Sequence, residues 1–244
     1  MLKRKLLVIL ASLLIITLFF LIYNNSIDTK SRESAYSGKE WLAVGDSITA
    51  FEKYQKTTKK VVGFDKVESN GLGGSTLASI NKKDKESIVY RIQHMDLNQD
   101  VITIFGGTND WGNKPAIPLG KMGDTDEKTV YGAIDTIIKS VLSKNPEARL
   151  IFITPLQRNF KEKPEEVVNG WSQTVTNDIG YKLEDVVNAI NEVCSKYSIP
   201  VLDLYHNSGI SKYNFDDMTK DGLHPNNKGM KRIGEQIGSF IISM

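Results

Sequence analysis

Five short strand-like runs, separated by longer segments of helical periodicity, constrain what this 244-residue chain can fold into. The runs lie at residues 41–44, 66–69, 101–105, 150–154 and 200–204. The helical patterns lie at 48–60, in part of 75–94, and at 129–143, 183–197 and 226–242. This alternation is typical of a parallel sheet covered by helices on both faces. We therefore predict an α/β fold, a three-layer α/β/α sandwich with a five-stranded parallel sheet and flavodoxin-like strand order.

Polar and glycine-rich motifs follow three of the predicted strands. Ser47 ends the Gly-Asp-Ser sequence after the first strand, Gly73 follows the second, and Asn109 follows the third. In open parallel sheets the working site lies beyond the carboxyl ends of the strands. The sequence therefore predicts that these three residues meet at one edge of the sheet.

A serine hydroxyl needs a base to take its proton, and the base works best when a third group orients it. The chain has three histidines, His94, His206 and His224. His94 ends a helical pattern and is typical of a surface or capping residue, whereas the position of His206 after a strand is ambiguous. His224 follows Asp221 by three residues and precedes Pro225, a residue favoured in the first turn of a helix. We predict that Asp221 orients His224 towards the serine; the simpler alternative is that these residues only form a turn.

An acyl-transfer site also needs donors for the oxyanion. The backbone N–H of Gly73 can approach a ligand closely because glycine has no Cβ, and Asn109 offers a side-chain amide. The N–H of Ser47, at a helix start, is the third candidate. The alternatives are that Gly73 belongs only to a tight turn and that Asn109 or Asp110 only caps a helix.

Composition and missing motifs exclude several other classes. The chain has no P-loop, no complete dinucleotide-binding fingerprint, no full nucleophile elbow and no cluster with metal-ligand spacing, so we expect neither cofactor nor metal. Without its first three basic residues, the 28 basic and 29 acidic residues give a net charge of −1. A nucleic-acid partner, which would require a clustered basic face, is therefore not expected.

Two long connections leave the edge of the sheet where the motifs lie. They span residues 111–128 and 155–180, and connections of this length tend to be functional. We predict that they form pocket walls, with Trp111, Arg158 and Trp171 as candidate substrate-binding residues. The tryptophans suit stacking on sugars, although packing roles are equally compatible with the sequence.

The N-terminal sequence is typical of a membrane anchor. Residues 6–23 form a run of 18 apolar or small uncharged residues after three basic ones, long enough to cross a bilayer. The basic flank favours a cytoplasmic N-terminus. We predict a signal anchor or transmembrane helix at 1–25, a polar tether at 26–39 and an extracytoplasmic catalytic domain at 40–244. Cleavage as a signal peptide, which would release a secreted domain, is the alternative.

Taken in order, these motifs resemble the four sequence blocks of the SGNH (GDSL-like) hydrolase superfamily. The blocks contain Ser47 in Gly-Asp-Ser-Ile-Thr, Gly73, Asn109 in Gly-Thr-Asn-Asp, and Asp221 with His224 in Asp-x-x-His-Pro. The first block has isoleucine where the family name carries leucine. The resemblance spans residues 40–242 and implies the SGNH hydrolase fold and a serine esterase.

The resulting hypothesis is ester hydrolysis through an acyl-enzyme. Ser47 would be the nucleophile, His224 the general base and then acid, and Asp221 its orienting partner. The expected substrate is a small ester or an acylated glycan or lipid, with preference for a short acyl group such as acetyl on a cell-surface glycan. The alternatives are a lysophospholipase or short-chain lipase, an acyltransferase, and a non-catalytic glycan-binding module. Oligomeric state does not follow from the sequence.

Overall fold

Five parallel strands form one sheet in the order β2-β1-β3-β4-β5. The computed structural model describes residues 15–17, 35–80, 84–113, 115–159 and 171–244. The strands are β1 (Glu40–Gly45), β2 (Lys66–Gly71), β3 (Val101–Phe105), β4 (Arg149–Ile153) and β5 (Val201–Leu202). The predicted five-stranded parallel sheet and its flavodoxin-like order are confirmed.

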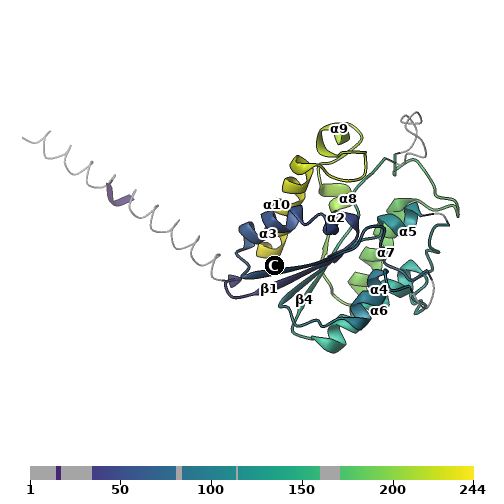
Figure 1. The fold of residues 1–244 in the computed structure, drawn as a ribbon, viewed down its shortest axis with the longest axis horizontal. Helices are drawn as coiled ribbons and strands as arrows, with labels where there is room; N and C mark the ends of the chain where they lie inside the picture. Colours follow the sequence, from purple (N-terminus) through teal and green to yellow (C-terminus); the bar gives the residue numbers. More distant parts are fainter. Residues whose placement is uncertain (1–14, 18–34, 81–83, 114, 160–170) are drawn as a thin grey trace, which may run out of the picture. The chain divides into compact units, whose positions relative to one another are not determined.

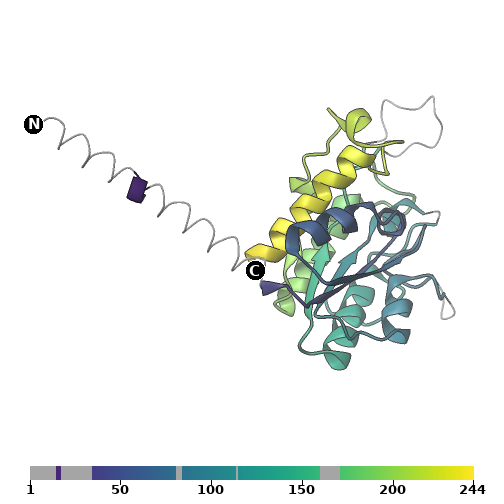
Figure 2. The same cartoon turned by 60° about the vertical axis from the view of Figure 1, so that its left-hand side comes forward.

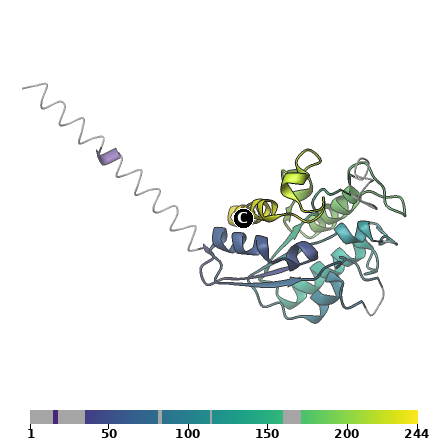
Figure 3. The same cartoon turned by 45° about the horizontal axis from the view of Figure 1, so that its top comes forward.

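Helices cover both faces of the sheet, so the predicted three layers are also confirmed (Figures 1 and 3). The longer helices are α3 (Lys53–Val62), α4 (Ile88–His94), α6 (Val130–Lys144), α7 (Leu183–Lys196) and α10 (Asn227–Ser243). The shorter helices among the described residues are α2 (Ser47–Ala50), α5 (Thr108–Gly112), α8 (Leu204–Asn207) and α9 (Phe215–Met218). Helices α3 and α10 lie side by side on one face (Figure 2), and α4, α6 and α7 cover the other.

The central strands are buried on both faces, as expected for a sheet between two helical layers. On one face, Leu42 and Val44 belong to the main hydrophobic core with α4, α6 and α7. On the other, the Trp41 ring stacks on Phe64 at 5.6 Å between centroids, and its Nε1 donates to Thr103 Oγ1 at 3.0 Å. This bond satisfies the one polar atom of a fully buried indole.

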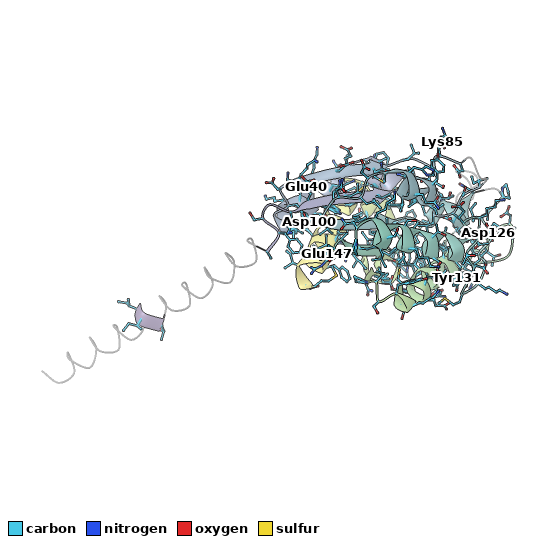
Figure 4. The ribbon with its side chains drawn as sticks, turned by 90° about the horizontal axis from the view of Figure 1, so that it is seen from below. Glu40, Lys85, Asp100, Asp126, Tyr131 and Glu147 are labelled. Carbon is cyan, nitrogen blue, oxygen red and sulfur yellow. The ribbon has the colours of Figure 1, made fainter. Side chains whose placement is uncertain are left out.

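All strands run in one direction, so the sheet has an amino end and a carboxyl end. Glu40, Asp100 and Glu147, which begin or precede β1, β3 and β4, lie together at one end in Figure 4. The backbone N–H of Glu40 donates to Asp100 Oδ2 at 2.8 Å there. The labelled residues Lys85 and Asp126 lie at the opposite end, where the strands finish. That carboxyl end carries the motifs that follow β1, β2 and β3.

Two predicted boundaries were wrong, those of the first helix and the last strand, and the helix expected in part of 75–94 is present. The helix expected at 48–60 is divided into α2 and α3, because Glu52 adopts a left-handed backbone with φ of 54°. The helix expected within 75–94 is confined to α4, since the preceding residues form a loop. The last strand ends at Leu202, because Asp203 caps α8 with its carboxylate on the His206 N–H.

Residues 38–244 form one compact unit. Within the described ranges, no helix has both the length and the apolar character needed to cross a bilayer. The anchor expected at 1–25 and the tether at 26–39 lie outside the described residues, apart from the helical residues 15–17 and from residues 35–39. The anchor and the tether therefore remain predictions.

Candidate functional site

Ser47 is the first residue of α2, directly beyond the carboxyl end of β1. The Asp46 side chain caps this helix by accepting the Ile48 N–H at 2.9 Å. Gly45 makes the sharp exit from the strand possible, since a Cβ at this position would lie 2.5 Å from the Phe105 carbonyl oxygen. The geometry leaves the Ser47 side chain free to face the segment that contains His224.

Ser47, His224 and Asp221 form one hydrogen-bonded chain. Ser47 Oγ lies 3.0 Å from His224 Nε2, and His224 Nδ1 lies 2.7 Å from Asp221 Oδ2. The other oxygen of Asp221 accepts the backbone N–H of His224 at 2.7 Å and of Leu223 at 2.9 Å. The carboxylate is thereby fixed relative to the imidazole that it orients.

The Asp221 carboxylate is held in its charged form. Its partial burial disfavours the charge, but the hydrogen bonds from the His224 side chain and from two backbone N–H groups outweigh burial. They lower the pKa of Asp221 below its ordinary value. An ionised Asp221 favours a proton on Nδ1 of His224, which leaves Nε2 as the acceptor for the serine hydroxyl.

Three neighbouring groups hold the His224 turn in place. The Phe51 ring meets the imidazole edge-on at 5.5 Å between centroids, and the backbone N–H of Lys220 donates to the His224 carbonyl at 2.8 Å. The backbone N–H of Asn159 donates to the Gly222 carbonyl at 2.9 Å. The turn is therefore held by the residue after α2, by the loop after β4 and by its own loop.

Asn109, on α5, and Gly73, in the loop after β2, lie at the same edge of the sheet as Ser47. The Asn109 side chain donates to the Ser75 carbonyl at 2.9 Å, while the loop with Gly73 joins β1 through the Leu72 N–H and the Gly45 carbonyl at 3.1 Å. A Cβ at Gly73 would meet no atom within 4 Å, so space adjoins this exposed backbone. Both residues are thus brought to the edge of the sheet where Ser47 lies.

Asp110, the neighbour of Asn109, is a structural residue of the site. Its buried carboxylate accepts the backbone N–H groups of Leu77 at 2.8 Å and Ala78 at 3.0 Å. Burial raises the pKa of Asp110 to about 6, although these two hydrogen bonds oppose the shift. Asp110 therefore fastens the loop after Gly73 to α5 and does not cap its own helix.

Asp46 is a buried carboxylate beside the serine. Burial raises its pKa to about 6. The hydrogen bond from Ile48 opposes this shift, as do the charges of His224, Arg158 and Arg91. This carboxylate therefore carries a desolvation cost that its positive neighbours offset only in part.

The three predicted substrate-binding residues have different environments. Trp111 is only 1% exposed, and its Nε1 donates to the Tyr181 carbonyl at 3.1 Å, so it packs in the core. Trp171 is also buried and packs against Phe215 at 5.6 Å between ring centroids. These are the packing roles that the sequence left as an alternative. Arg158 donates to Thr108 Oγ1 at 3.1 Å, beside Asn109.

The other two histidines lie outside this chain of hydrogen bonds. His94 is exposed and stacks on Tyr90 at 3.9 Å. His206 pairs with Asp203 at the same spacing as His224 with Asp221, at 2.7 Å, but its Nε2 meets Glu184 Oε1 at 3.2 Å and not a hydroxyl.

Sequence reasoning missed two contributors, Arg91 and Phe51. Arg91 bonds to Gly45, which precedes Ser47, and to Ser75, which follows Gly73, and Phe51 contacts His224. The sequence did indicate Phe51: it follows Ser47 by four residues, and residues four apart on a helix lie on the same face. Arg91 had none, because its partners are distant in sequence.

A family model and several solved structures match this chain. A family model described as the GDSL-like lipase/acylhydrolase family matches residues 43–232. A solved structure from Lactobacillus plantarum is 29% identical with a TM-score of 0.73, and the match covers 85% of this chain and 98% of that one. No curated protein matched.

Two further structures share the fold at lower identity. A possible lipase from Chitinophaga pinensis is 24% identical with a TM-score of 0.67, covering 84% of this chain and 98% of that chain. The lipase/acylhydrolase from Enterococcus faecalis is 20% identical with a TM-score of 0.59, covering 84% and 96%. The family match includes Ser47, Asn109 and His224.

Proposed function

The chain belongs to the GDSL-like lipase/acylhydrolase family and is a hydrolase that acts on esters, and we propose that it works through an acyl-enzyme on Ser47. The observation that carries this proposal is the continuous path from Ser47 Oγ through the His224 ring to Asp221, with 3.0 Å and 2.7 Å contacts. Both distances are within hydrogen-bond reach, the first requirement for a nucleophile and its base.

In the first half-reaction, Ser47 Oγ attacks the ester carbonyl carbon while His224 Nε2 accepts its proton. The resulting imidazolium is stabilised by Asp221 and returns the proton to the alkoxide as the carbon–oxygen bond to the alcohol breaks. Water then attacks the acyl-enzyme with His224 again as base, which releases the acid and restores Ser47. An alcohol in place of water would give acyl transfer by the same steps.

The negative charge of each tetrahedral intermediate needs donors. We assign this role to the N–H groups of Ser47 and Gly73 and to the Asn109 amide. One hydrogen of the Asn109 amide is held by the Ser75 carbonyl, and the second is available to the oxyanion. The space beside Gly73 supports this assignment, because an incoming carbonyl oxygen can reach the backbone there.

For the natural substrate we propose a short acyl ester, such as an O-acetyl group on a cell-surface glycan, with the domain held outside the cytoplasm by the predicted N-terminal anchor.

A second candidate, a short-chain lipase or lysophospholipase, is supported by two exposed apolar residues beside the serine. Phe51 is 40% exposed and Leu72 is 37% exposed, and both suit contact with an acyl chain. Membrane fractionation of cells that produce the full-length chain tests the anchor.

Hydrolysis of p-nitrophenyl esters from acetate to palmitate by the full-length chain tests the function. We expect turnover of the short esters, loss of that turnover in Ser47→Ala, and normal turnover in Ser143→Ala, which removes an exposed hydroxyl on α6. A steep rise with acyl length would favour the lipid substrate. Equal rates for wild type and Ser47→Ala on every ester would refute the proposal.

A further inference from the structure

The guanidinium group of Arg91, on α4, joins three segments that meet beside Ser47. Its Nη2 donates to the Gly45 carbonyl at 2.9 Å and to Ser75 Oγ at 2.8 Å. Its Nη1 donates to the Asn70 carbonyl at 2.6 Å and also contacts the Asn70 side-chain oxygen. One planar group therefore holds the ends of two strands and the loop that follows the second.

These acceptors lie next to the proposed oxyanion donors. Gly45 precedes Ser47 by two residues, and Ser75 follows Gly73 by two residues. The carbonyl of Ser75 is the group that accepts the Asn109 amide at 2.9 Å. Ser47 and Gly73 are thus each two residues from a residue that Arg91 contacts. Asn109 is hydrogen-bonded to one of these residues, Ser75.

Ser75 links the arginine to the asparagine. Its hydroxyl donates to the Glu86 carbonyl at 2.6 Å, so the lone pairs of the oxygen are left for the Arg91 donor. With the side chain fixed from two directions, the Ser75 carbonyl has a defined position, and it determines where the Asn109 amide points. Arg91 therefore affects the position of the Asn109 amide through Ser75, although the guanidinium does not contact that amide.

We propose that Arg91 is a positioning residue that sets the relative positions of the Ser47 N–H, the Gly73 N–H and the Asn109 amide. This inference rests on the proposed function, because it assumes that these donors hold an oxyanion. The acceptors belong to two strands and to the loop after β2, and one planar guanidinium reaches all of them. A lysine ammonium, with a single nitrogen, cannot reproduce this arrangement. Arg91 also interacts favourably with the charge of the buried Asp46 at the same turn.

The test compares Arg91→Met with Arg232→Met in the full-length chain. Arg232 also donates from Nη1 to a backbone carbonyl, that of Gly209 at 2.8 Å, but it lies on α10 and is not part of the site. We expect kcat on p-nitrophenyl acetate to fall about 10²-fold in Arg91→Met, because misplacement by roughly 1 Å costs about this factor. KM should change by less than about threefold, since the lost stabilisation arises in the transition state.

Two readouts separate positioning from a general loss of structure. Inhibition by an alkylboronic acid, which forms a tetrahedral adduct, should weaken in proportion to kcat/KM in Arg91→Met. Arg91→Lys should stay close to Arg91→Met, because it restores the charge without the fork. Wild-type turnover in Arg91→Lys, or an unchanged boronate affinity in Arg91→Met, would overturn the inference.

Amide hydrogen exchange across residues 70–76 gives a readout that needs no turnover. We expect exchange there to accelerate on the order of tenfold in Arg91→Met but not in Arg232→Met, because charged hydrogen bonds on this segment are lost. If Arg91→Met fails to fold, Ser75→Ala removes one link of the same network and should show the same pattern with a smaller effect.

The failure of the function and the failure of the inference are distinguishable. If wild type shows no Ser47-dependent turnover, the proposed function is wrong, and the exchange measurement alone decides whether Arg91 holds the 70–76 segment. If wild type is active and Arg91→Met matches it in kcat and in exchange, the function stands and the positioning role is refuted.

Discussion

Replacing Asp46 with asparagine should stabilise the folded chain at neutral pH. Burial raises the pKa of Asp46 from 3.8 to about 6, with the opposing charges of Arg91 and Arg158 already included. A shift of roughly two units corresponds to about 3 kcal/mol, because each unit is worth about 1.4 kcal/mol. Asparagine keeps the side-chain oxygen that caps the Ile48 N–H at 2.9 Å but carries no charge.

The pH dependence follows from the direction of the shift. Since the folded pKa lies above the unfolded value, the folded state binds the extra proton between about pH 4 and 6. The wild-type chain therefore has this part of its stability below pH 4 and loses it as the pH rises to about 6. Asp46→Asn has no carboxyl group to lose a proton at this position. The free energy of unfolding of the variant relative to wild type should therefore rise between about pH 4 and 6 and stay constant at higher pH.

Urea unfolding between pH 3.5 and 8, followed by the fluorescence of the three tryptophans, measures this difference. Asp110, whose pKa is raised in part by the charge of Asp46, contributes to the curve of each protein. A difference between variant and wild type that is flat across pH 4–6, or that favours wild type at pH 7, would refute the reasoning. Either result would mean that the Ile48 hydrogen bond and the charges of His224, Arg158 and Arg91 stabilise the Asp46 carboxylate at least as much as burial destabilises it.

Three further predictions concern the site. Asn109→Ala should lower kcat by about 10²–10³ without unfolding the domain, because it removes one oxyanion donor; near-normal ester turnover would exclude that role. His224→Ala should abolish turnover while His206→Ala leaves it unchanged, since the Nε2 of His206 meets a glutamate; equal losses in the two variants would contradict the assignment. Gly71→Ala should lower the thermal midpoint and activity together, because the new Cβ would lie 2.2 Å from the Ala50 backbone nitrogen; a calorimetric midpoint equal to that of wild type would show that the loop can shift.

The sheet and the Ser47–His224–Asp221 geometry could be predicted because their signals are local. Short apolar runs mark buried strands, and the alternation of strands and helices restricts the topology to few choices. The strand ends then bring Ser47 to the same edge as the later motifs, and Asp221 reaches His224 across one turn. Such contacts depend on topology and short spacing, both of which can be read along the chain.

The remainder of the site depends on contacts distant in sequence. Arg91 bonds to Gly45 and Asn70, which precede it by 46 and 21 residues, and no local pattern indicates such partners. Exposure is also invisible in the sequence, since Trp111 and Trp171 lie in or beside loops yet pack inside. Phe51 is instead the exposed aromatic residue that contacts the histidine, because Glu52 ends the short helix there.

The most direct test of the central claim is to trap the acyl-enzyme. The full-length chain is mixed with p-nitrophenyl acetate, quenched in acid within the first turnover, and digested for mass spectrometry. We predict one acetyl group on the peptide that contains Ser47, a burst of p-nitrophenol of up to one equivalent, and neither signal in Ser47→Ala. Turnover with no acetylated Ser47 and an undiminished rate in Ser47→Ala would contradict the claim.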